Sequence, residues 1–161
     1  MRLKEIIAIL ISSFIGLVFT LQIQPWLFQT GSIPLVNVTP EEFHNSYIVG
    51  ALIVLSTALL FTLIWYFNAL RLDSKVVSVE LLNKIFLVWI IFLVIVILIA
   101  ISTVSFYVQS ASEALLYLGV FWILDVVFLF YLPTAIATPG QLAHVVPFSE
   151  RLRKIFKIDE E

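Results

Sequence analysis

Four stretches of this sequence are apolar enough and long enough to cross a lipid bilayer, which requires about 20 predominantly apolar residues. Hydrophobic residues make up 61% of the 161 residues and charged residues 12%, against about 25% charged residues in an ordinary soluble domain. A soluble core has no room for so much apolar surface. We therefore predict an all-α integral membrane protein, a four-helix transmembrane bundle with spans at about residues 6–21, 47–69, 85–108 and 114–132.

The basic residues indicate the direction in which the chain crosses the membrane. Lysine and arginine accumulate in cytoplasmic segments because they resist translocation. All nine lie before the first span, between the second and third, or after the fourth, and segments 22–46 and 109–113 contain none. We therefore predict a multi-pass protein of the cell (inner) membrane with both termini in the cytoplasm. The nine residues are Arg2, Lys4, Arg71, Lys75, Lys84, Arg151, Arg153, Lys154 and Lys157.

The second span has a well-marked start. Thr39 and Glu42 have the spacing of a capping box, and Pro40 occupies the first helical position, where its missing N–H costs nothing. We therefore expect this helix to begin before the membrane does and to be longer than the hydrocarbon core is thick.

One ionisable residue, Asp125, lies near the middle of the fourth span. Such a residue is costly in a bilayer and is a functional hypothesis by default. Thr62 on the second span, and Ser12 or Ser13 on the first, are expected at a similar depth, and desolvation favours a neutral acid that can donate to a hydroxyl. Three roles stay open: a hydrogen bond that holds the bundle together, a water-lined or oligomeric ion path, and pairing with a basic residue of another subunit.

Small residues follow one face of each of the first two spans. Ser12, Gly16 and Thr20 are spaced by four, and Ala51 and Ala58 form a comparable face on the second span. Small residues let transmembrane helices approach closely. These faces are therefore predicted to be helix-packing surfaces, either within one chain or between subunits.

We place the boundary of the transmembrane domain at residue 137 and treat residues 138–161 as a cytoplasmic tail. Its apolar residues recur at helical spacing and basic residues fill much of the remainder, which predicts a short amphipathic helix. Such a helix docks on the membrane surface, or its apolar face fits a groove of a partner protein. The residues predicted to dock are Phe148, Arg151, Leu152, Arg153, Lys154, Ile155, Phe156 and Lys157.

Several kinds of chemistry are excluded or disfavoured by composition. The sequence has no cysteine, so thiol catalysis, zinc ribbons and iron–sulfur clusters are excluded. Glu41 and His44 have the spacing of a carboxylate metal site, but one such pair supplies too few ligands. We therefore predict no metal and no cofactor. The net charge of −2, with no basic and aromatic surface segment, argues against nucleic acid.

The function predicted from these features is assembly. We expect a non-enzymatic integral membrane subunit that has the lipid bilayer as its surroundings and associates with itself or with a larger partner complex. The first alternative is an oligomeric pore or ion-conducting effector with Asp125 facing a shared interior. The second is a membrane-embedded lipid or quinone enzyme, although a single carboxylate rarely suffices for catalysis.

Overall fold

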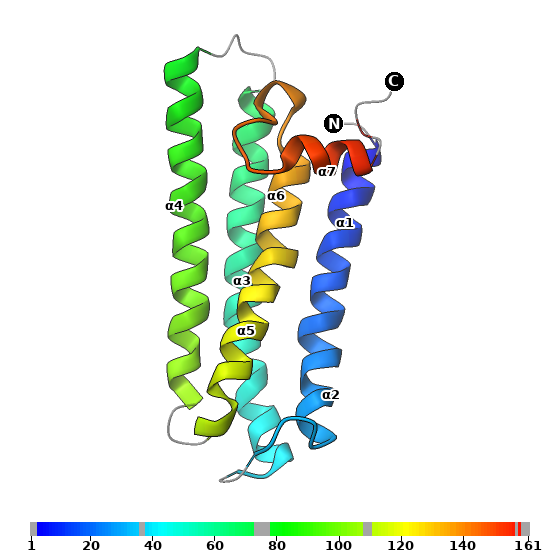
Figure 1. Cartoon of the computed structure of the whole chain (residues 1–161), viewed down its shortest axis with the longest axis vertical. Helices are drawn as coiled ribbons and strands as arrows, with labels where there is room; N and C mark the ends of the chain where they lie inside the picture. The colour runs from blue at the N-terminus through cyan, green and yellow to red at the C-terminus, as the bar shows by residue number, and fades with distance from the viewer. Residues whose placement is uncertain (1–2, 36–37, 73–77, 108–110, 157, 159–161) are drawn as a thin grey trace.

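The computed structural model describes residues 3–35, 38–72, 78–107, 111–156 and 158. Of the described residues, 86% are helical and none is in a strand. Four helical rods stand side by side, each long and apolar enough to cross a membrane (Figure 1). The predicted all-α four-helix bundle is thus confirmed.

The four rods differ in how regular they are. The second and third consist mainly of one long α-helix each, whereas the first and fourth contain a π-helical turn. A short helix, α7, follows the fourth rod and lies across the end of the bundle at which α1 begins, which we call the terminal end (Figure 1). The bounds are α1 Leu3–Val18, a π-helical turn Phe19–Ile23 and α2 Gln24–Gln29; α3 Pro40–Leu72; α4 Val79–Val104 and a 3-10 turn Ser105–Tyr107; a 3-10 turn Ser112–Ala114, α5 Leu115–Val126, a π-helical turn Val127–Tyr131 and α6 Leu132–Ala137; a 3-10 turn Gly140–Leu142; and α7 Ser149–Ile155.

The start of α3 follows from its capping box. The Glu42 amide donates to Thr39 Oγ1 at 3.3 Å, and the Thr39 amide donates to Glu42 Oε2 at 3.2 Å, which confirms the box. With 33 residues, α3 is about 50 Å long at 1.5 Å per residue. The hydrocarbon core is only about 30 Å thick, so α3 must tilt or extend beyond it.

The first and fourth spans each contain a proline that is preceded by a π-helical turn. Gln24 N donates to Phe19 O and Leu132 N donates to Val127 O, each five residues back, and proline follows at the next position in both. Proline has no N–H and cannot continue an α-helical ladder without a defect. The π-helical turn absorbs that defect. The fourth span therefore continues through Pro133 to Ala137, beyond the predicted end at residue 132.

Helix α3 supplies the donors that the two prolines lack. The Tyr47 hydroxyl donates to Thr20 O, and Thr62 Oγ1 donates to Leu129 O, both at 2.8 Å. These carbonyls lie five residues before Pro25 and four residues before Pro133. Because nothing in hydrocarbon can replace a missing donor, α3 makes both interruptions tolerable inside a membrane.

Replacing Thr62 with valine is expected to reduce the free energy of unfolding by about 1 kcal/mol, because Leu129 O would lose its donor. The measurement is an SDS unfolding titration of the protein purified in mild detergent. Thr103→Val is the matched control, since the Thr103 hydroxyl donates only to Ala100 O of its own helix. An equal loss for both variants would contradict a bridging role for Thr62.

An aromatic cluster fills the opposite end of the bundle. Phe28 and Phe43 have ring centroids 4.6 Å apart, and Tyr107 and Trp122 are 5.6 Å apart. Gly50 lets α3 approach this cluster, since a Cβ there would lie 2.5 Å from the Tyr107 hydroxyl and 2.9 Å from the Trp122 ring. The aromatic side chains therefore pack the bundle closely at this end.

Candidate functional site

A buried polar cluster around Asp125 joins three of the four spans. Asp125 of α5 is fully buried, and its Oδ1 accepts hydrogen bonds from Thr20 Oγ1 at 2.7 Å and from Gln24 Nε2 at 2.8 Å. Tyr47 of α3 lies 2.6 Å from Gln24 Oε1, which is an alternative acceptor for the single hydroxyl proton that Tyr47 donates to Thr20 O. The cluster is assembled at the π-helical turn of the first span, which places Thr20 and Gln24 against α5.

The hydrogen-bonding capacity of this cluster is incompletely used. Asp125 Oδ2 and Trp122 Nε1 are both buried, and neither has a hydrogen-bond partner among the described residues. The two residues are three positions apart on α5, which is about one helical turn.

The residues predicted to surround Asp125 are not the ones that do. Thr62 donates to Leu129 O, Ser12 donates to Ile9 O within its own helix at 3.0 Å, and Ser13 is half-buried beside a shallow surface hollow on α1. The depth comparison failed because it counted from the cytoplasmic face and ended the fourth span at residue 132, whereas that span runs on to Ala137, so Asp125 lies further from the terminal end. Residues one to three turns further along therefore reach the level of Asp125.

Sequence reasoning missed Gln24 as a site residue, although a signal was present. Thr20 and Gln24 are four residues apart, so on a helix they lie on one face. Thr20 was predicted to be a helix-packing residue, and Gln24 fell in segment 22–46, outside the predicted first span. A glutamine directly before a proline, at the end of an apolar run, is the feature that could have identified it.

The small-residue face of the first span packs inside this chain. Ser12, Gly16 and Thr20 are all buried, and a Cβ on Gly16 would lie 2.6 Å from Leu129 Cδ2. Ala51 and Ala58 on α3 are fully buried as well. Gly16 therefore lets α1 approach the fourth span closely, and Ala51 and Ala58 belong to the buried face of α3.

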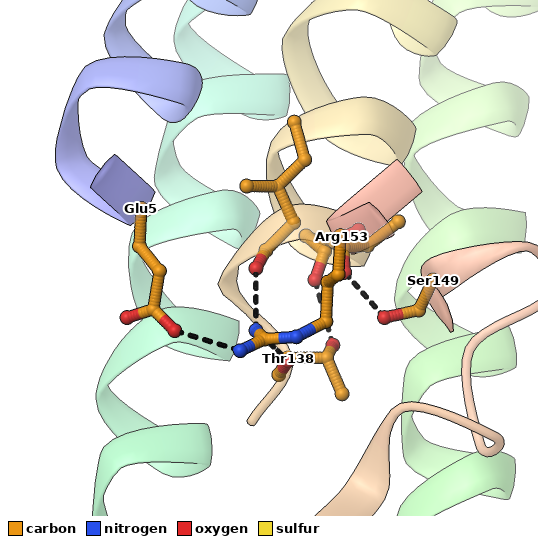
Figure 2. A network of polar contacts seen from close by, with 7 residues as sticks. Glu5, Thr138, Ser149 and Arg153 are labelled. Carbon is orange, nitrogen blue, oxygen red and sulfur yellow. Dashed lines mark hydrogen bonds and ion pairs between the residues drawn. The ribbon is translucent and has the colours of Figure 1, made fainter. Parts of the chain in front are cut away.

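A second polar network ties the tail to the terminal end (Figure 2). The buried Arg153 of α7 donates through Nη1 to Ile136 O at 3.2 Å and to Thr138 O at 2.7 Å, and its Nη2 pairs with Glu5 Oε1 at 3.0 Å. Ser149 Oγ donates to Ala135 O at 2.6 Å. The last carbonyls of a helix have no intrahelical donors, so Arg153 satisfies α6 while joining it to α1.

Two tryptophans extend this network to the other spans. Trp65 Nε1 of α3 donates to Thr138 Oγ1 at 3.2 Å, and Trp89 Nε1 of α4 donates to Thr134 Oγ1 at 3.1 Å. The first three spans are consequently linked to the end of the fourth, the first through Arg153 and the other two through the tryptophans.

The predicted docking residues of the tail separate into an inner and an outer set. Arg153 was predicted to dock on the membrane surface or on a partner protein but is buried, whereas Phe148 and Ile155 are 62% and 71% exposed. The amphipathic pattern could not identify this burial because the backbone carbonyls to which Arg153 donates belong to another part of the chain. Lys157 lies outside the described residues. Arg151 and Lys154 are exposed, and Leu152 and Phe156 are half-buried.

A candidate metal centre does not emerge from the part of the chain that the structure describes. Glu41 and His44 lie in the first turns of α3, and no group of three or more His, Cys, Asp or Glu side chains is found among the described residues.

Comparison of the chain with models of known protein families, with curated proteins and with solved structures finds no match. Function must therefore be argued from the two polar networks and from the surfaces they fix in place.

Proposed function

We propose that this protein is a non-enzymatic integral membrane subunit that acts by assembly with a partner protein, and that the outer face of α7 is the contact surface. The observation that carries the proposal is the anchoring of α7 by buried Arg153 and Ser149. This anchoring leaves Phe148 and Ile155 exposed. Arg151 and Lys154 lie exposed on the same short helix.

The outer face is fixed in shape as well as in position. Phe148 has φ +62°, a left-handed backbone conformation that is strained for a bulky residue and is a reason to suspect function. The Arg151 guanidinium carbon lies 5.8 Å from the centre of the Phe148 ring, so the aromatic and the cation form one unit. Aromatic and arginine side chains of this kind are enriched among the residues that dominate binding energy at protein interfaces.

The packing of the spans favours a different protein over a second copy as the partner. The small-residue face of α1 is occupied by Leu129 of the same chain, which removes the main motif for helix pairing between copies. The accumulation of basic residues at the terminal end supports a cytoplasmic location for this surface. We accordingly propose a cytoplasmic or membrane partner that carries an acidic and apolar surface.

The buried environment of Asp125 supports assembly over the alternatives. Its Oδ1 is engaged by two side chains of the same chain, and the residue is fully buried, so it offers no group to a lumen shared between copies. Catalysis would require a second reactive group within reach of a substrate. The burial of Asp125 and the need for a second reactive group therefore favour a non-enzymatic role.

The proposal is tested with a photoreactive amino acid at position 155 in the intact protein in its native membrane. We expect a discrete crosslinked species that is larger than the monomer and that is lost when Phe148 is replaced with alanine. Val79 is the matched control, because it is 75% exposed and apolar but lies at the start of α4. Adducts of equal yield at both positions, or a monomer alone on native gels with no adduct, would refute the proposal.

A further inference from the structure

A surface groove separates α1 from α3 near the terminal end. Helix α1 packs mainly against α6 and the π-helical turn of the fourth span. Between α1 and α3 lies a groove of about 310 Å³. Its walls are formed by Ile6, Ile9, Leu10, Thr62, Leu63, Tyr66 and Ala137.

The lining of this groove suits a hydrocarbon chain. Five of its seven residues are aliphatic. The polar group of Thr62 is already used, because its hydroxyl donates to Leu129 O. No polar ligand group is therefore needed to satisfy Thr62, and an apolar occupant leaves it paired.

The position of the groove fixes which part of a lipid would lie in it. From Ile6 to Leu10 the groove follows α1 for about 6 Å, and it begins beside the Glu5–Arg153 ion pair that closes the terminal end. Tyr66 of α3 lines the groove together with Ile6, the residue after Glu5, at the level where aromatic residues mark the membrane interface. The groove therefore meets the first carbons of an acyl chain, just below a headgroup.

The charge of this end indicates the headgroup. Arg71 lies in the last turn of α3 and Lys154 lies on α7, and the side chains of Arg71 and Lys154 are exposed. Basic residues at the membrane surface attract anionic lipids. The carboxylate of Glu5, the residue before Ile6 of the groove, is paired with Arg153.

We propose that the groove between α1 and α3 binds the upper part of one acyl chain of an anionic phospholipid from the leaflet at the terminal end. A partner helix is not the occupant, because a helix is about 10 Å across and the groove is only about one turn long. This site rests on the membrane-spanning bundle and not on the proposed partner contact at α7.

The test uses the full-length protein in nanodiscs that contain phosphatidylglycerol or phosphatidylcholine with a photoreactive group near the start of an identical acyl chain. Leu63→Trp fills the groove, and Leu60→Trp is its matched control, because Leu60 lies on the same helix outside the groove with nearly the same exposure, 55% against 54%. Both variants are first checked for monodisperse elution in mild detergent.

With phosphatidylglycerol, we expect labelling of residues 6–10 and 62–66 in the unaltered protein and in Leu60→Trp. We expect at least a fivefold decrease in Leu63→Trp and with phosphatidylcholine. Equal labelling of the two variants, equal labelling by the two lipids, or labelling spread evenly along the exposed face of α4 would overturn the site. None of these results bears on crosslinking at position 155, so the two proposals fail separately.

Discussion

Replacing Arg153 with methionine is expected to lower the free energy of unfolding by about 3 to 5 kcal/mol, the usual cost of breaking a buried ion pair from one side. Methionine keeps much of the side-chain volume but provides no donor. The change would leave the carbonyls of Ile136 and Thr138 without the donors they have now, and Glu5 would lose an ionic partner at a largely buried position. Helix α7 would keep its anchor at Ser149 but would lose its contacts with Ile136 O, Thr138 O and Glu5.

An SDS unfolding titration in mild detergent measures this loss, and limited proteolysis after residue 138 reports whether the tail has detached. Lys154→Met is the matched control, because it removes the neighbouring charge from an exposed position and should change stability by less than about 0.5 kcal/mol. Adding Glu5→Gln to Arg153→Met should recover part of the loss, since the neutral amide needs no counter-ion. A loss as large in Lys154→Met would show that total charge, and not the buried contacts, determines stability.

The transmembrane architecture was predictable because it depends on the total hydrophobicity of long segments of the chain. Each span is recognised by about 20 apolar residues together, so no single residue decides the outcome. The start of α3 was predictable for a different reason, because the capping box is a local pattern with bonds between Thr39 and Glu42 only. Span hydrophobicity and helix capping can both be predicted from the sequence without knowing which helices contact one another.

The polar networks could not be predicted in the same way, because they depend on contacts between helices. Asp125 was identified from its cost in hydrocarbon, but its partner Gln24 reaches it only because Pro25 is accommodated by a π-helical turn. Arg153 looked like one of several exposed basic residues. Only the position of α7 across the end of α6 turns it into a buried donor to backbone carbonyls.

The predicted role of Asp125 as a structural acceptor leads to an expected difference between two substitutions. Asp125→Val should reduce the free energy of unfolding by about 2 kcal/mol, within the range for a buried donor that loses its partner. The amide of Gln24 is that donor. Thr20 is less affected, because its hydroxyl lies 2.8 Å from Gly16 O and can donate there instead.

Asp125→Asn should cost less than about 1 kcal/mol, because the amide oxygen still accepts from Thr20 and Gln24 while most polar contacts between transmembrane helices are individually weak. Both variants are compared with the unaltered protein by SDS titration and by proton flux in liposomes. If the cluster is a structural join between the first span, α3 and α5, stability separates valine from asparagine and the flux is the same for all three proteins. A change in proton flux with asparagine at unchanged stability would instead assign Asp125 to an ion path, and the unused Oδ2 would then be the atom through which protons pass.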